Sequence, residues 1–169
     1  MTRYFANPSQ AAAPHMHADA LGFIDTPEQR NTRPQVRWCA DNGVFSPSRA
    51  KRGQEWDAAG WWTWLQAQAA DAHLCTFAVA PDVLHWKQDD TGTWYPVGDH
   101  AATAELSRQW IPAMKALGFP VAYVLQDGCT VDEVPWTDID AVFIGGSDDW
   151  KVGPAGLQMD GTPKGDVPV

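Results

Sequence analysis

The chain has 169 residues, 44% of them hydrophobic, which is enough for one domain with a substantial core. No run in the sequence approaches the roughly 20 apolar residues of a membrane span, and the net charge of −9 argues against a protein that coats nucleic acid. Three cysteines, odd in number and widely spaced, argue against a disulfide framework or a CxxC zinc site and favour a cytoplasmic setting.

The charge is unevenly distributed along the chain. Residues 1–52 contain seven lysine or arginine residues and four acidic ones, a balance of +3, so the remainder carries −12. A phosphate-binding patch in the N-terminal third is one interpretation, and solvated surface arginines are the other.

The N-terminal third is expected to contain little regular structure. The sequence suggests a short strand over Arg3–Ala6, a helical turn near Ala18–Phe23, and a strand over Gln35–Ala40. The last of these runs into an Asn-Gly turn, which places Asp41 at the carboxyl end of a strand. Residues 46–53 are expected to form a polar, basic loop.

A helix and a buried strand are expected next. Apolar residues recur at three- and four-residue steps over Glu55–His73, which predicts an amphipathic helix. Leu74–Ala80 is an apolar run that Pro81 ends, because proline cannot donate to a ladder, and Asp82 falls in the following loop. Residues 87–98 are expected to form a polar loop or hairpin.

The second long helix is expected over His100–Leu117. Asp99 is its predicted N-cap, and Gly118 is the residue predicted to end it. Pro112 lies inside this stretch and is expected to kink or divide the helix.

Val121–Leu125 and Ala141–Ile144 are two short, wholly apolar runs rich in β-branched residues. Such strands are typical of α/β proteins in which both faces of a parallel sheet are covered. Spacings of about forty residues between the earlier strands leave room for crossover helices, so parallel βα units are expected. Residues 1–153 would form the domain and residues 154–169 an irregular tail.

Polar residues and glycines follow four of the predicted strands. They are Asp41, Asp82, Gln126, and the pair Gly145 and Gly146. At one edge of a parallel sheet they would meet around a pocket. Carboxylates and a carboxamide suit recognition of a planar heterocycle, and a carboxylate near a sugar–base bond can act as general acid/base or nucleophile. The alternative is that each is a turn-forming residue. The histidines show no metal-ligand spacing, so no metal is expected.

Four segments at these positions resemble motifs of one enzyme family. They are Asp41–Ser46 (DNGVFS), Val79–Val83 (VAPDV), Val124–Gly128 (VLQDG) and Phe143–Ser147 (FIGGS), with Trp150 and Lys151 after the last. In order and spacing, residues 35–153 are similar to tRNA-guanine transglycosylases, and most similar to the DNA-modifying, DpdA-like branch of phages and bacteria.

The resemblance implies a TIM-like (β/α)8 barrel that exchanges guanine in DNA or tRNA for a 7-deazaguanine such as preQ0, without a cofactor. It implies a general acid/base role for Asp41. Asp82 and Gln126 would bind the purine-like edge of the base, and the backbone of Gly145 and Gly146 would contact it.

The family's nucleophilic aspartate follows the glycine segment at a distance that this sequence does not reach, and Asp160 is only superficially similar to it. The expectation is therefore a barrel incomplete at its C-terminus, inactive unless a second chain completes it. Two alternatives remain open. One is a non-catalytic base-binding or complementing subunit. The other is a glycoside hydrolase-like enzyme with Asp41 and Asp82 as its paired carboxylates.

Overall fold

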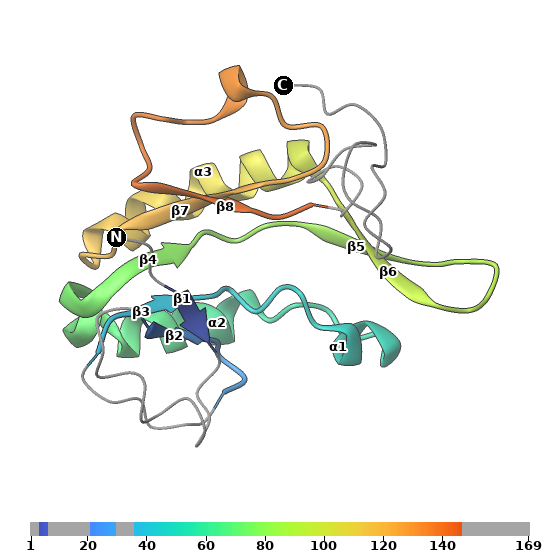
Figure 1. Ribbon diagram of the computed structural model, residues 1–169, viewed down its shortest axis with the longest axis horizontal. Coiled ribbons are helices and arrows are strands. Elements are labelled where there is room, and N and C mark those ends of the chain that lie inside the picture. The colour runs from blue at the N-terminus through green and yellow to red at the C-terminus, as the bar shows by residue number, and fades with distance from the viewer. Residues whose placement is uncertain (1–3, 7–20, 30–35, 147–169) are drawn as a thin grey trace.

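The computed structural model describes residues 4–6, 21–29 and 36–146, which form an α/β fold around a parallel sheet (Figure 1). The six strands of this sheet are β1 (Tyr4–Ala6), β2 (Leu21–Asp25), β3 (Trp38–Ala40), β4 (Cys75–Val79), β7 (Val121–Leu125) and β8 (Ala141–Ile144). Every neighbouring pair is parallel, and their order in space is their order in the sequence. Within the described residues, each strand of this sheet is therefore added next to the one before it in the chain, on the same side.

A separate antiparallel hairpin extends from one end of the molecule (Figure 1). Its strands are β5 (Leu84–Gln88) and β6 (Trp94–Gly98), paired from Leu84 with Gly98 to Gln88 with Trp94. The hairpin is inserted between β4 and the long helix α3, so its base lies near the carboxyl end of β4.

The helical segments in the described residues are α1 (Pro47–Lys51), α2 (Ala58–Ala67), α3 (His100–Ala116) and two 3₁₀ turns, η2 (Ala69–Leu74) and η3 (Val131–Glu133). The ring of Trp110 on α3 lies 5.3 Å from that of Trp61 and 5.1 Å from that of Trp62, both on α2. The two long helices therefore cover the same face of the sheet. The core contains Phe23, Trp38, Ala40, Trp61, Leu65, Ala78, Ile111, Met114, Val121 and Tyr123.

The opposite face is concave. The ring of Phe5 on β1 lies 6.0 Å from that of Phe77 on β4, although these strands are three positions apart. In a flat sheet that separation would be roughly 14 Å, because neighbouring strands lie about 4.8 Å apart. Phe77 also contacts Phe143 on β8, with ring centroids 6.3 Å apart. The sheet is therefore strongly curved, and Phe77 packs against both Phe5 and Phe143 on its concave face.

The predicted start and stop of the second long helix, α3, are confirmed in detail, whereas α2 begins at Ala58 and not at the expected Glu55. The carboxylate of Asp99 caps α3 by accepting a hydrogen bond of 2.9 Å from the backbone N–H of Ala102. Asp57 caps α2 in the same way through Gly60. Gly118 follows α3 with φ of +86°, a conformation that favours glycine.

Two predictions in the N-terminal third were wrong. The helical turn expected near Ala18–Phe23 overlaps the strand β2 (Leu21–Asp25), which pairs with β1 and β3. The reason is tertiary: Phe23 is only 2% exposed, and a central position in the sheet outweighs weak local preferences. The expected loop over residues 46–53 contains the short helix α1, with Pro47 at its first turn, where proline is tolerated.

Other boundaries shift. The Gln35–Ala40 strand is confined to Trp38–Ala40, and the Glu55–His73 helix is replaced by α2 followed by η2. The polar stretch 87–98 belongs to a hairpin that begins at Leu84. Pro112 lies within α3 without dividing it. The tail lies outside the described residues.

Candidate functional site

A pocket of about 350 Å³ opens at the carboxyl ends of β3, β4, β7 and β8. Its lining includes all five residues singled out from the sequence: Asp41, Asp82, Gln126, Gly145 and Gly146. The remaining lining residues are Asn42, Phe45, Val79, Leu84, Pro96, Gly98, Val124, Phe143 and Ile144. The predicted convergence at one edge of a parallel sheet is therefore present in the structure.

Asp82 is the most constrained of these residues. Its side chain is only 8% exposed. One carboxylate oxygen accepts a hydrogen bond of 2.7 Å from the amide of Asn42, and the other accepts one of 2.5 Å from the amide of Gln126. Burial raises the pKa of Asp82 to about 6, the nearby charge of Asp41 adds to the rise, and the two hydrogen bonds oppose it. The carboxylate is thus fixed in orientation and close to its titration range at neutral pH.

Gln126 lies beneath the pocket with both ends of its carboxamide in use. It is 0% exposed, and its oxygen accepts a hydrogen bond of 2.9 Å from the backbone N–H of Gly146. A Cβ added at Gly98 would lie 2.2 Å from the same oxygen, so only glycine leaves room for this side chain. Gln126 therefore links Asp82 to the residues after β8. Its expected direct contact with a base stays a prediction.

Asp41 lies at the end of β3 and begins a tight turn. Its carboxylate accepts a hydrogen bond of 2.7 Å from the backbone N–H of Gly43, which has φ of +69°. Burial raises the pKa of Asp41, and the bond from Gly43 partly offsets that effect. Two carboxyl groups with raised pKa values thus line one cavity, an arrangement common where proton transfer is catalysed.

The structure adds Asn42, which the sequence suggested only as a turn former. It is 4% exposed, and its amide nitrogen donates to the carbonyl of Ala80 at 2.9 Å as well as to Asp82. Its side-chain oxygen accepts from the N–H of Val44, and its backbone carbonyl accepts from the indole of Trp56. Asn42 joins the ends of β3 and β4. The Asn-Gly dipeptide gives no signal of this role.

Helix α3 fixes the segment that carries Asp82. The Ser107 hydroxyl donates to the carbonyl of Pro81 at 3.0 Å, and the Thr103 hydroxyl accepts from the N–H of Val83 at 2.9 Å. Both side chains are fully buried. The residues on either side of Asp82 are therefore both hydrogen-bonded to α3, which fixes the backbone around the carboxylate.

Phe45 is an exposed aromatic residue in the lining of the pocket. It is 61% exposed, and its ring centroid lies 5.4 Å from that of Trp86 on the hairpin. An exposed aromatic ring beside a polar pocket is a surface on which a planar ligand can stack.

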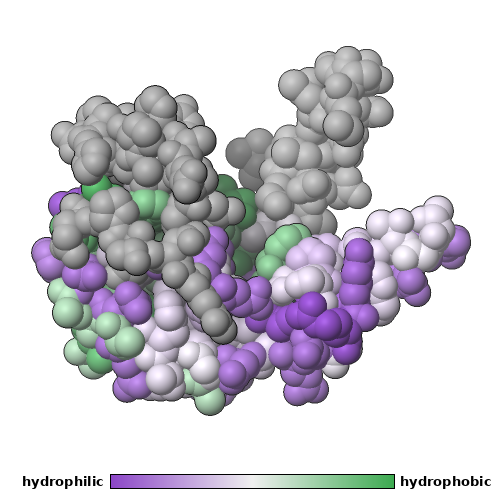
Figure 2. Space-filling view, turned by 90° about the horizontal axis from the view of Figure 1, so that it is seen from below, coloured by the Kyte–Doolittle hydropathy of each residue, from purple (hydrophilic) through white to green (hydrophobic). Residues whose placement is uncertain are grey.

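The basic residues near the pocket have mixed roles. Arg49 on α1 pairs with Glu28 at 2.7 Å and also bonds the carbonyl of Gly43, so it stabilises the turn after β3. Lys51 and Arg52 are exposed, and Figure 2 shows a hydrophilic surface around α1. A phosphate-binding role for this surface stays a prediction.

The chain was compared with family models, curated proteins and solved structures, and none matches it. Within the described residues, no helix is long and apolar enough to cross a membrane. Ser147, Trp150, Lys151 and Asp160, which belong to the motif comparison, lie outside the described residues.

Proposed function

We propose that the pocket binds a guanine-like base and that the chain belongs to a transglycosylase-like system. Such a system exchanges guanine in DNA or tRNA for a 7-deazaguanine such as preQ0. The observation that carries this proposal is the fixed, buried carboxylate of Asp82 in the same pocket as Asp41, at the carboxyl ends of parallel strands.

Asp82 suits the donor edge of guanine. Guanine and preQ0 share an adjacent ring N–H and exocyclic amine, and a carboxylate can accept hydrogen bonds from both. The amides of Asn42 and Gln126 hold Asp82 in place, and pairing with a base would complete its environment. Adenine does not present this pair of donors. With adenine the Asp82 carboxylate would be left with an unpaired oxygen, and this would disfavour adenine relative to guanine.

Asp41 is assigned the proton-transfer role. Its raised pKa favours a carboxyl group that can give a proton to a departing base and take one from the incoming base. Gly145 is assigned the backbone-contact role because it lines the pocket, and its lack of a side chain also leaves room for Val124, from which an added Cβ would lie only 2.7 Å away.

The strand order and curvature also support the barrel proposal. A parallel sheet whose spatial order follows the chain, curved enough to bring β1 and β4 side chains together, matches the first part of a (β/α)8 barrel.

Calorimetric titration with preQ0, guanine and adenine tests the proposal. We expect preQ0 and guanine to bind, adenine not to bind, and Asp82→Ala to lose at least tenfold in affinity. Asp90→Ala, in the exposed turn of the hairpin, serves as the matched control. Equal affinity of the Asp82→Ala variant and the parent would remove the proposal.

A second candidate is a base-binding subunit that needs a partner for catalysis. It is favoured by β8, which is the last strand of the described sheet and has Val142 37% and Ile144 61% exposed. Exchange of labelled guanine in DNA and tRNA by the chain alone separates the two. Turnover supports the single-chain enzyme, whereas base binding without turnover supports the subunit.

A further inference from the structure

A second polar cluster lies between the start of α3 and the segment after β7. His100 is the first residue of α3, Cys129 follows β7, and Glu133 is in η3. One ligand atom from each lies within 4.8 Å of the other two, the only such trio of histidine, cysteine and acidic residues among the described positions. No pattern in the sequence predicts this cluster, because His100 is about thirty residues from the other two.

The separation between His100 and Glu133 suits a tetrahedral ion. Nε2 of His100 lies 3.3 Å from Oε2 of Glu133. Two ligands held at about 2.0–2.1 Å from a tetrahedral zinc ion are themselves about 3.3 Å apart. The Glu133 carboxylate is oriented by hydrogen bonds from the backbone N–H and hydroxyl of Thr130, at 2.9 and 2.7 Å. Such supporting bonds are usual for carboxylates that ligate metals.

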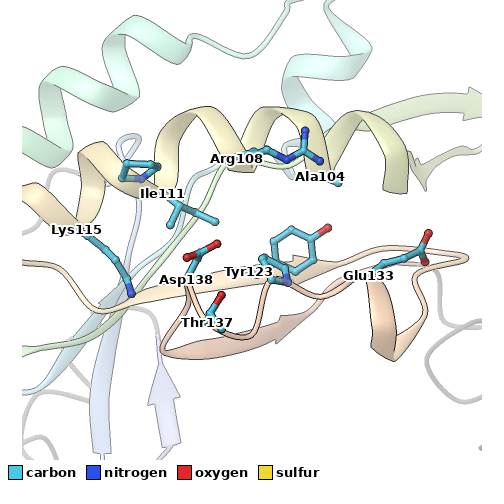
Figure 3. Close-up of a pocket in the computed structure, with 10 residues that line it drawn as sticks. Ala104, Arg108, Ile111, Lys115, Tyr123, Glu133, Thr137 and Asp138 are labelled. Atoms are coloured by element: carbon cyan, nitrogen blue, oxygen red, sulfur yellow. The ribbon is translucent and has the colours of Figure 1, made fainter.

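Two unsatisfied polar atoms are associated with the same region. Nδ1 of His100 and the hydroxyl of Tyr123 are buried without a hydrogen-bond partner, and the described residues contain no other such side-chain atoms. Tyr123 and Glu133 both line a cavity of about 370 Å³ beneath α3 (Figure 3). Buried unpaired polar groups are often explained by bound water, and an ion held through Nε2 of His100 would leave Nδ1 as the protonated ring nitrogen.

We propose that His100, Cys129 and Glu133 bind a divalent transition-metal ion of the zinc class. The ligands would be Nε2 of His100, the thiolate of Cys129 and Oε2 of Glu133. Imidazole and thiolate together favour zinc over magnesium or calcium. Three protein ligands leave a fourth position for water or for a group in the adjoining cavity.

The metal would connect the start of α3 with the segment after β7, and both segments lie next to residues of the base pocket. Gly98, which packs against Gln126, is two residues before His100, and Gln126 is three residues before Cys129. The N–H of Cys129 donates to the carbonyl of Gln126 at 3.0 Å. Binding at this site would therefore stabilise the segment that follows Gln126 and the segment of Gly98 that packs against it.

Cobalt(II) titration of the chelator-treated full chain tests the site without any base present. We expect one equivalent to produce a thiolate-to-cobalt charge-transfer band that zinc then abolishes. Cys129→Ser and His100→Ala should lose the band, and Glu133→Gln should weaken cobalt binding by about tenfold or more. Cys75→Ala and Glu105→Gln should behave like the parent.

Thermal unfolding without metal would verify that each variant is folded. The proposal is overturned if the parent shows no charge-transfer band, or if the band survives in both Cys129→Ser and His100→Ala. Neither result would affect the titrations with preQ0, so the metal site and the base site are judged separately.

Discussion

Replacing Asp82 with asparagine should change how the stability of the protein depends on pH. Burial raises the pKa of Asp82 from 3.8 to about 6. Between these values the folded chain keeps a proton that the unfolded chain has released, so the free energy of unfolding falls as the pH rises. The full rise in pKa corresponds to about 3 kcal/mol, present below about pH 4 and lost by about pH 6.

The informative quantity is the free energy of unfolding of the parent minus that of Asp82→Asn, measured in urea from pH 4 to pH 7. We expect this difference to fall by about 2.4 kcal/mol over that range, because part of the total is already lost at pH 4. Hydrogen bonds from Ala102 and Thr130 lower the pKa values of Asp99 and Glu133, respectively, which gives the opposite slope, but these groups are present in both proteins and cancel. Asp90→Asn should parallel the parent. A difference that stays flat, or that rises with pH, would refute the assignment of Asp82 as a buried carboxyl with a raised pKa.

Two further substitutions test the supports of Asp82. Asn42→Ala removes the donor to both Ala80 and Asp82, and we expect a loss of about 1–3 kcal/mol in urea unfolding together with weaker preQ0 binding; an unchanged urea midpoint would show that these bonds contribute nothing. Gly98→Ala places a methyl group 2.2 Å from the Gln126 oxygen, so preQ0 affinity should fall at least tenfold while circular dichroism shows the fold retained; parental affinity would mean that Gln126 need not occupy this position.

The elements with strong local signals were predictable. β7 and β8 match the expected residues 121–125 and 141–144, because runs of β-branched residues that end in polar or glycine residues mark buried strands. Both ends of α3 were predictable. Asp99 caps its start, and Gly118 can adopt the positive φ that follows its end. Because the carboxyl ends of the strands were predicted, the residues that follow them could be predicted to meet at the pocket.

The rest depends on contacts that a linear pattern does not record. β2 is held by two neighbouring strands and by burial of Phe23, and its five residues alone suggest no strand. The bonding of Asn42 to the end of β4 spans 40 positions. The cluster of His100 with Cys129 arises only because β7 returns the chain beside the start of α3.

The most direct test of the account is a crystal structure of the chain grown with preQ0. The account predicts that the base lies in the pocket with its ring N–H and exocyclic amine within hydrogen-bonding distance, about 2.7–3.2 Å, of the Asp82 carboxylate. It also predicts that the five-membered ring of the base lies on the side of Asp41. A base bound elsewhere, or bound in this pocket with its donor edge turned away from Asp82, would contradict it.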